Sequence, residues 1–600
     1  MSKRKRKLEE GPFLKQHNWI SMVSLILVVV LIFSIYDSAR GGNSIETGWK
    51  DGDVKSYIQH MTLEEKIGQL FIVHVYGKTP TDPDYEETNL NSNRGVKNFE
   101  EMIEKYHIGG VIYFNWTDNI SSPLDATLVN ELSNGIQEIA MNKRIPIPLL
   151  ISTDQEGGIV ARVTEPATVF PGNMALGATR SQEYAKNSAK IMGMELKSLG
   201  INTNFAPVID VNVNPKNPVI GVRSFGEDPN LVSDKGINQM EGYQSENVIT
   251  TVKHFPGHGD TDVDSHYGLP IIEQDLERLH EVELKPFKAA IDAGVDAIMP
   301  GHIVVPALDD SDLPATFSRV ILTDLLRGEL GFSGLIVTDS LDMAGANVFP
   351  PERVAVETFK AGADVLLNPP DVDLAYNAML EAVRNGEISE NRVDQSVSRI
   401  LEIKMEKGLF QNPYTDPDNI SLIGNEEHLR QANEMTNDSI TLVKNDNHIL
   451  PFEKNASLLV TGPSSGRTDL LADLLNEKTV KADSYATDLS PTTEQINIAA
   501  SRAKDADAVI VTTYTANTNS DQQKLVHSLR ETGKPIIVTA VRNPYDIAVF
   551  PEIDAYVTTY GDQDISIHSL ANVLTGEVNP KGKLPVTIQG LYEYGHGLSY

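Results

Sequence analysis

The 600-residue chain contains no cysteine. This absence excludes disulfide bonds, thiolate metal ligands, a cysteine nucleophile and a cysteine that could carry a lipid after a signal sequence. Positive charge is also scarce, since 51 Lys and Arg stand against 83 Asp and Glu, for a formal net charge of -32. A nucleic-acid partner requires a basic surface, so we expect no nucleic-acid binding.

The first 40 residues differ in composition from the rest. A basic cluster at positions 3–7 precedes eighteen apolar-dominated residues, Trp19 to Tyr36. That length is just enough to cross a hydrocarbon core of ~30 Å as a helix. The basic flank predicts a cytoplasmic tail (1–18), a transmembrane anchor or signal segment (19–36) and export of the remainder. We expect a single-pass cell-membrane protein with its main domains outside the cell, or a secreted one if the segment is cleaved.

Eight short apolar runs alternate with helical stretches between residues 60 and 370. The runs are 70–75, 109–114, 147–153, 204–210, 248–253, 296–301, 334–339 and 363–368. Their near-continuous hydrophobicity is typical of strands buried on both faces, and helical spacers imply parallel pairing. Eight such units predict an α/β fold with a (β/α)8 TIM barrel over 50–410. A doubly wound sheet is the alternative. TLEE at Thr62 predicts a capping box with Glu65 at the start of the first helix.

A smaller second domain is predicted after the barrel. The stretch QNPYTDPDN (411–419) is rich in Pro, Asn and Asp and indicates a linker, which we place at 411–430. Strand-like runs at 440–445, 457–462, 508–514, 535–541 and 555–560 again alternate with helical spacers. They predict an α/β sandwich over 431–600. GPSSGRT (462–468) has too few residues between its glycines for a phosphate-binding loop, and Arg467 stands where lysine belongs.

Polar residues gather at the carboxyl ends of the predicted barrel strands. In strand order they are Asp154, Asp210, Lys253, His254, His302 and Asp339. Each aspartate taken singly could cap the next helix. TIM-barrel enzymes, however, carry their chemistry at this end of the barrel, so the recurrence indicates a functional site.

The stretch KHFPGHGDTDVDSH (253–266) holds three histidines and three aspartates. DTDVD begins like a calcium loop, but Ser265 occupies its sixth position and Ile271 its twelfth, where glycine and glutamate belong. Proline and two glycines in HFPGHG predict a bent loop, not a helix that would space zinc ligands. We therefore predict no metal site and no cofactor.

The remaining interpretation of this stretch is a polar pocket with a proton shuttle. Lys253 and His254 close a strand and would point into the barrel mouth. Asp264 stands two residues before His266 on a glycine-rich loop that we expect to be mobile. An aspartate so placed can orient the ring and stabilise its protonated form. A histidine that titrates near neutral pH can protonate a leaving group and later activate water.

Several motifs together resemble family 3 of the glycoside hydrolases. They are KHFPGHGDTDVDSH, DQEGG (154–158), IGVRSFGEDP (220–229) and IVTDSLDM (336–343). MTLEEKIGQL (61–70) is similar to the opening of that family's barrel. Similarity to its second domain lies in SITLVKNDNHILPF (439–452), KGKLPVTI (581–588) and YGHGLSY (594–600). More narrowly, KHFPGHGDTDVDSH resembles the β-N-acetylglucosaminidase branch that acts on peptidoglycan fragments.

The resemblance implies a role for each matching position. Asp339 would be the nucleophile, and His266, partnered by Asp264, the general acid/base. The residues that would hold the sugar hydroxyls in the first subsite are Asp154, Arg223, Lys253 and His254. The chain departs from the family pattern at Ser340, where an acidic residue is common, and at Ile159, where arginine is frequent.

These matches imply a retaining, exo-acting enzyme that removes terminal GlcNAc from cell-wall oligosaccharides (muropeptides) during cell-wall turnover. We expect a monomer. A family 3 β-glucosidase or xylosidase is an alternative, although those enzymes generally take their acid from a glutamate outside the first domain. A GlcNAc phosphorylase is another, because a histidine base repels phosphate less than a carboxylate does. A non-catalytic wall-binding protein is disfavoured by the intact Asp339, Asp264 and His266.

Overall fold

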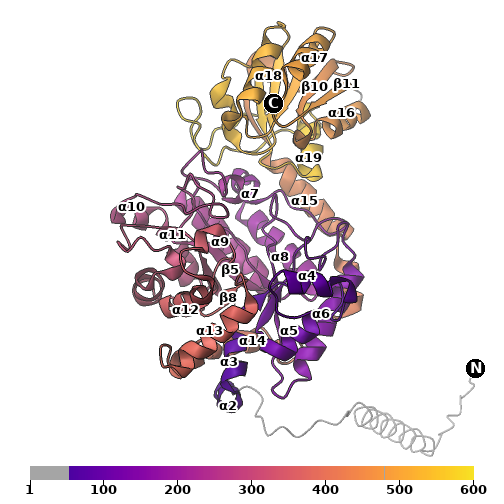
Figure 1. Cartoon of the computed structure of the whole chain (residues 1–600). Helices are drawn as coiled ribbons and strands as arrows, with labels where there is room; N and C mark the ends of the chain where they lie inside the picture. The colour runs from indigo at the N-terminus through magenta and orange to yellow at the C-terminus, as the bar shows by residue number, and fades with distance from the viewer. Residues whose placement is uncertain (1–52, 479) are drawn as a thin grey trace, which may run out of the picture. The chain divides into compact units, whose positions relative to one another are not determined.

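Short hydrophobic strands form a barrel in the first part of the chain (Figure 1). This computed structural model describes residues 53–478 and 480–600, and eight parallel strands pair in the order β7-β6-β5-β4-β3-β2-β1-β8. They are β1 (Phe71–Val73), β2 (Gly110–Ile112), β3 (Leu150–Thr153), β4 (Thr203–Asn204), β5 (Ile249–Phe255), β6 (Ala297–Pro300), β7 (Leu335–Ile336) and β8 (Leu366–Leu367). A parallel bridge between Val337 and Val365 joins β7 to β8 and closes the sheet. The predicted TIM barrel is confirmed.

Helical segments follow each barrel strand. They are η1 (Pro83–Tyr85), α4 (Glu86–Asn91), α5 (Phe99–Tyr106), α6 (Ala126–Met141), α7 (Asn173–Thr179), α8 (Gln182–Ser198), η2 (Gly221–Arg223), α9 (Pro229–Ser245), α10 (Leu276–Glu281), α11 (Leu284–Asp292), η3 (Ala315–Phe317), the π-helix η4 (Val320–Glu329), η5 (Ala344–Ala346), α12 (Pro351–Ala361), α13 (Val372–Arg384) and α14 (Glu390–Glu406). Two helices precede β1, namely α2 (Val54–His60) and α3 (Leu63–Gln69). The predicted capping box at the start of α3 is confirmed, since Thr62 and Glu65 exchange two hydrogen bonds of 2.8 and 3.2 Å.

A six-stranded sheet forms the second domain, in the order β11-β10-β12-β13-β14-β9. Its strands are β9 (Thr441–Asn445), β10 (Ser457–Pro463), β11 (Lys481–Thr487), β12 (Ala508–Thr513), β13 (Ile536–Ala540) and β14 (Ala555–Thr558). All neighbours pair parallel except β14 and β9. The helical segments are η6 (Pro417–Leu422), α15 (Glu426–Ser439), η7 (Asp446–His448), η8 (Ser464–Gly466), α16 (Thr468–Glu477), α17 (Thr493–Ala503), η9 (Ala516–Thr518), α18 (Ser520–Arg530), η10 (Pro544–Val549) and α19 (Asp564–Leu574).

Separate hydrophobic cores lie on the two faces of this sheet. One contains apolar residues of α17 and α18, and the other contains those of α16 and α19. Helices therefore cover both faces, which confirms the predicted α/β sandwich. The sequence runs missed β11, because KADSYAT is a partly exposed edge strand with little of the hydrophobicity that marks the inner strands.

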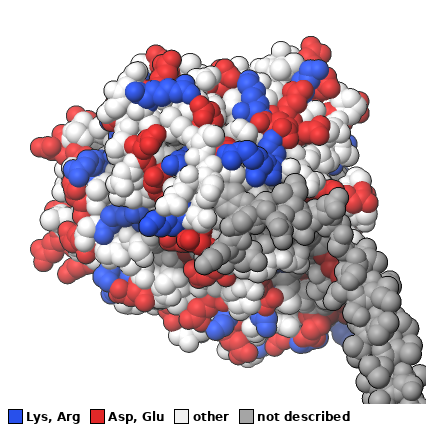
Figure 2. All heavy atoms as spheres, turned by 90° about the horizontal axis from the view of Figure 1, so that it is seen from below, with Lys and Arg blue, Asp and Glu red and all other residues white. Residues whose placement is uncertain are grey.

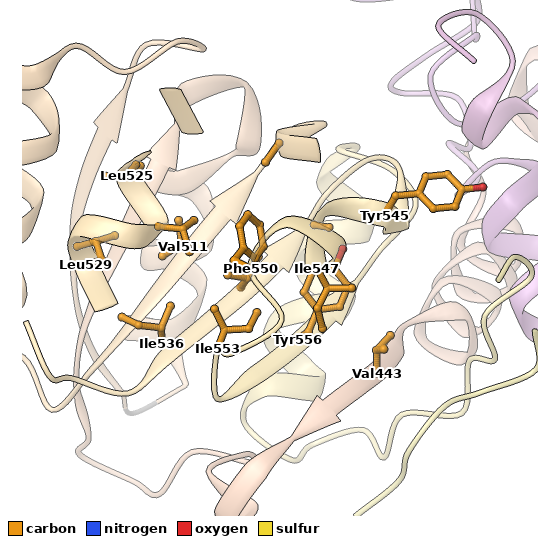
Figure 3. Packing of buried hydrophobic residues seen from close by; sticks show 14 of the residues in the cluster. Val443, Val511, Leu525, Leu529, Ile536, Tyr545, Ile547, Phe550, Ile553 and Tyr556 are labelled. Carbon is orange, nitrogen blue, oxygen red and sulfur yellow. The ribbon is translucent and has the colours of Figure 1, made fainter. Parts of the chain in front are cut away.

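The first of these cores extends into the barrel. It includes Val222, which directly precedes Arg223, together with residues of α7. Tyr545 reaches from the same core toward the barrel (Figure 3), where its hydroxyl accepts a hydrogen bond from the Asn212 amide (3.0 Å). The backbone N–H of Thr587 donates to the Glu227 carboxylate (2.8 Å). The second domain thus packs against the segment that carries Arg223.

Ile159, one of the two departures from the family pattern, packs against this shared core. An isoleucine side chain is suited to that apolar contact, whereas a charged side chain would have to be desolvated there. The packing gives this substitution a structural reason.

The predicted anchor at 19–36 lies outside the described residues. Among the helices that the structure does describe, none combines the length and hydrophobicity needed to span a bilayer. The acidic excess appears on the face shown in Figure 2, where acidic side chains are spread widely and basic ones are scattered among them.

Candidate active site

A cavity of about 250 Å³ opens at the carboxyl ends of the barrel strands. Six of the seven predicted site residues line it, and they are Asp154, Arg223, Lys253, His254, His266 and Asp339. The seventh, Asp264, is hydrogen-bonded to His266. The described residues that line the cavity all lie between positions 74 and 368. The barrel therefore brings together residues that are far apart in the sequence, at the end where TIM barrels carry their sites.

Two cations and two carboxylates form a buried network at one side of the cavity. The Lys253 ammonium lies 2.8 Å from Asp154 Oδ1 and 2.9 Å from Glu156 Oε1. The Arg223 guanidinium donates to both oxygens of Glu156, at 2.9 and 2.8 Å. This forked pairing fixes the guanidinium plane. Glu156 thereby holds Lys253 and Arg223 in position, while Asp154 is the more exposed of the two carboxylates.

The electrostatics keep this network charged. Burial alone would raise the pKa of Glu156, but Arg223 and Lys253 outweigh it and hold that pKa well below its ordinary value. Burial likewise opposes the charge on Lys253, yet Asp154 and Glu156 raise the pKa of its ammonium. Multiple charged donors and acceptors at a cavity wall can make strong hydrogen bonds to the hydroxyls of a sugar.

His254 is oriented by an aspartate from the segment that follows the neighbouring strand β4. Asp210 is fully buried, and its carboxylate accepts from His254 Nδ1 at 2.7 Å and from the His254 backbone N–H at 3.1 Å. Since a carboxylate only accepts, Nδ1 carries the proton and Nε2 faces the cavity, 3.5 Å from an Arg223 nitrogen. The pairing of β5 with β6 shifts register between Lys253 and Phe255, where two consecutive side chains reach the same cavity.

Asp339 lies just beyond β7 on the cavity wall. Its Oδ1 accepts a hydrogen bond from the Ser340 backbone N–H (2.8 Å). Burial opposes its ionisation, but His254, His302 and Lys253 favour the carboxylate, so the pKa of Asp339 lies below its usual value. The side chain is therefore an anion at neutral pH, as a nucleophile must be.

His266 and Asp264 lie on the loop that follows β5. The Asp264 carboxylate accepts from His266 Nδ1 (2.7 Å) and from the His266 backbone N–H (2.9 Å). This pair fixes the ring and leaves Nε2 for proton transfer. The His266 side chain is 53% exposed, in contrast to the buried Lys253 and His254.

Close packing accounts for the glycines before this dyad. A Cβ atom on Gly259 would lie 1.8 Å from the carbonyl oxygen of Val211. One on Gly257, whose φ is +131°, would lie 2.9 Å from the Glu283 side chain. Mobility of the loop remains a prediction.

The Glu283 side chain lies against Gly257 of this loop, and it should make the stability of the fold depend on pH. Burial raises its pKa to about 7, although Arg278 donates to its Oε1 at 3.0 Å and opposes the shift. In the unfolded chain the Glu283 carboxyl loses its proton near pH 4.5. The stability that the folded state gains from holding this proton is therefore fully present below that pH and is lost as the pH rises through about 7. We expect Glu283→Gln to remove this dependence.

Thermal unfolding at pH 5 and pH 8 checks the expectation. From pH 5 to pH 8 the free energy of unfolding of wild type should fall by on the order of 1–2 kcal/mol more than that of Glu283→Gln. Glu273→Gln, an exposed carboxylate in the preceding segment, serves as the matched control. Parallel pH profiles for wild type and Glu283→Gln would contradict the assignment.

Several lining residues were not expected from the sequence. Asp210, which holds His254 without lining the cavity itself, was expected only as a strand-end residue. Among the lining residues, Glu156 lies within the DQEGG motif but had no assigned role. Others are His74, Phe114, Trp116, Arg162 and Asn368. Position after a barrel strand was the available signal for His74, Phe114 and Asn368. No comparable signal marks Arg162, which lies in the loop between β3 and α7.

Comparison with known proteins agrees with this architecture. Residues 62–403 match the model of the glycosyl hydrolase family 3 N-terminal domain, and residues 440–600 match that of the family 3 C-terminal domain. The chain belongs to glycosyl hydrolase family 3. The resemblance inferred from the motifs is confirmed, and the protein is a family 3 glycoside hydrolase.

Relatives within family 3 extend over most of the chain. Beta-hexosaminidase A of Pseudoalteromonas piscicida is 36% identical over 556 residues, which cover 81% of this chain and 90% of that protein. A solved family 3 β-N-acetylglucosaminidase from Paenibacillus sp. str. FPU-7 is 35% identical with a TM-score of 0.79, covering 88% and 99% of the two chains. A beta-N-acetylglucosaminidase/beta-glucosidase of Cellulomonas fimi is 29% identical over 574 residues, which cover 89% of this chain and 95% of that protein.

Proposed function

We propose that this protein is an exo-acting β-N-acetylglucosaminidase that removes non-reducing terminal GlcNAc with retention of configuration. The observation that carries the proposal is the Asp264–His266 pair, which brings an acid/base group from the barrel loop to the cavity that contains Asp339. All described lining residues belong to the barrel, which argues against a glutamate acid supplied by the second domain. The hexosaminidase relatives support the same substrate class.

The mechanism follows from the placement of the polar groups. Asp154, Arg223, Lys253 and His254 hold the hydroxyls of the terminal sugar and direct its anomeric carbon toward Asp339. Asp339 attacks that carbon while protonated His266 donates its Nε2 proton to the departing oxygen. This step gives a covalent glycosyl-aspartate and a neutral imidazole. Water, deprotonated by His266, then releases GlcNAc with β configuration and restores both residues.

The physiological substrate in this proposal is a peptidoglycan fragment, and the reaction belongs to cell-wall turnover. An exported enzyme held by the segment 19–36 would meet such muropeptides outside the membrane. The proposed placement rests on the basic flank and apolar length of that segment alone.

Three assays test the proposal. The full chain should hydrolyse p-nitrophenyl β-GlcNAc at least tenfold faster, in kcat/KM, than the matching glucoside. NMR of the first-formed sugar should show the β anomer. GlcNAc-β-1,4-MurNAc should be cleaved at a rate independent of added phosphate. Preference for the glucoside would establish the glucosidase alternative, and a phosphate requirement with GlcNAc 1-phosphate as product would establish the phosphorylase.

A further inference from the structure

An exposed tryptophan lies at the cavity that contains Asp339. Trp116 follows β2 and lines the cavity, yet its ring is 55% exposed. By contrast, the side chains of Arg223, Lys253 and His254 in the same cavity are at most 9% exposed. Large aromatic side chains are usually buried, so one held at the mouth of a ligand cavity is informative.

One face of the Trp116 ring is covered and the other is open. Its inner face stacks on Phe114, with ring centroids 3.9 Å apart and an interplanar angle of 17°. The Arg162 guanidinium lies 4.9 Å from the Trp116 centroid and 5.7 Å from that of Phe114. A cation on the outer face of Trp116 would be far more distant from Phe114, so Arg162 lies beside the stack. Among the described residues, no ring or cation contact covers the outer face.

The loop that carries Trp116 is fixed by hydrogen bonds on both sides. The Asn115 amide donates to the Arg162 carbonyl oxygen (2.8 Å), and the Thr117 hydroxyl donates to the Phe114 carbonyl oxygen (3.0 Å). The buried Asn119 amide donates to the carbonyl oxygens of Val75 and Gly77, at 2.9 and 2.8 Å. The backbone of the loop is therefore held in place before any ligand arrives, and the ring rests on Phe114, which lowers the entropic cost of binding.

We propose that Trp116 is a stacking platform for the leaving sugar of the substrate. The inference rests on the proposed exo-acting function. In a cavity whose buried end holds the terminal sugar, the remainder of the substrate must extend through the mouth. A pyranose ring presents one face of C–H groups, which is the chemical complement of an open aromatic face bordered by polar groups. Trp116 would thus bind a neutral or substituted pyranose in the position that leaves.

Two substrates that share the cleaved sugar but differ in the leaving group test this assignment. In β-GlcNAc fluoride the leaving group is one atom, whereas in N,N′-diacetylchitobiose it is a sugar. Trp116→Ala should lower kcat/KM for chitobiose roughly tenfold, mainly through KM, and change that for the fluoride by less than about twofold. Trp116→Phe, which keeps a ring, should recover most of the loss. Tyr414→Ala removes an exposed aromatic elsewhere and should leave both rates unchanged.

Equal losses on both substrates would overturn the proposal, because Trp116 would then act on the cleaved sugar or on the shape of the site. Wild-type rates with both substrates would overturn it too. If the enzyme prefers glucosides, the proposed function is wrong. The platform is then tested in the same way with β-glucosyl fluoride and cellobiose as the two substrates. GlcNAc-β-1,4-MurNAc as a third substrate shows whether a lactyl-substituted ring is accepted on the platform.

Direct binding gives a readout independent of turnover. Trp116 is the one tryptophan among the described residues, and the others, Trp19 and Trp49, lie outside them. In an Asp339→Asn background, chitobiose should change tryptophan fluorescence more than GlcNAc does. That excess change should vanish when Trp116→Phe is added, and its persistence would contradict the stacking contact.

Discussion

Asp339→Ala is expected to lower kcat/KM on p-nitrophenyl β-GlcNAc by on the order of 10⁴-fold, because no other group replaces the attacking carboxylate. Added azide should restore part of the activity and give the α-glycosyl azide, since the small anion enters the vacated space and attacks from the same face. Asp324→Ala, an exposed aspartate on η4, is the matched control and should retain wild-type rates.

A covalent label provides the second test of Asp339. A fluorinated GlcNAc analogue that slows hydrolysis of the intermediate should add one sugar to the wild-type chain, and peptide mapping should locate it at Asp339. A label at another carboxylate, or full activity of the alanine variant, would rule out the nucleophile assignment. Thermal unfolding of the variant establishes that any loss of activity reflects chemistry and not misfolding.

His266→Ala is expected to separate substrates by the basicity of their leaving group. For chitobiose, whose leaving alkoxide needs a proton, kcat/KM should fall by on the order of 10³-fold. For dinitrophenyl β-GlcNAc, which leaves without a proton, kcat/KM should change less than about tenfold. The ratio kcat/KM reports only the steps up to formation of the covalent intermediate.

The same variant should show a reduced kcat on the activated substrate, because water must then attack without a base. Azide, which needs no base, should restore that kcat. Asp264→Asn should reproduce the pattern with smaller losses, since it weakens the orientation of the ring but keeps the imidazole. His280→Ala, an exposed histidine, is the control. Equal losses on both substrates would refute the acid/base role of His266.

The barrel was predictable because its signal is local. Each strand is a short apolar run buried on both faces, and polar residues follow the runs, so chain order alone placed Asp154, Asp339 and the pair Lys253–His254 at one end. The edge strand β11 was missed since half-exposed residues do not carry this signal. Trp116 was also missed, because its exposure and its stacking on Phe114 depend on the folded loop.

The second domain shows the same limit. Its fold was predictable from alternating runs, but its contact with the barrel was not. Val222 joins a core made mostly of second-domain residues, and Glu227 binds Thr587 across 360 positions of sequence. These contacts hold the segment around Arg223 in place, and no local sequence pattern links it to the residues of the second domain that make them.

The sequence by itself determined the family, the two α/β domains and the identity of the polar groups at the barrel mouth. Only the tertiary structure decided how these groups are paired. Lys253 meets Asp154 across 99 positions, and Glu156 becomes the shared partner of Lys253 and Arg223. The reason is physical: ion pairing and pKa depend on distances of a few ångströms and on burial, and neither quantity is written in the order of residues along the chain.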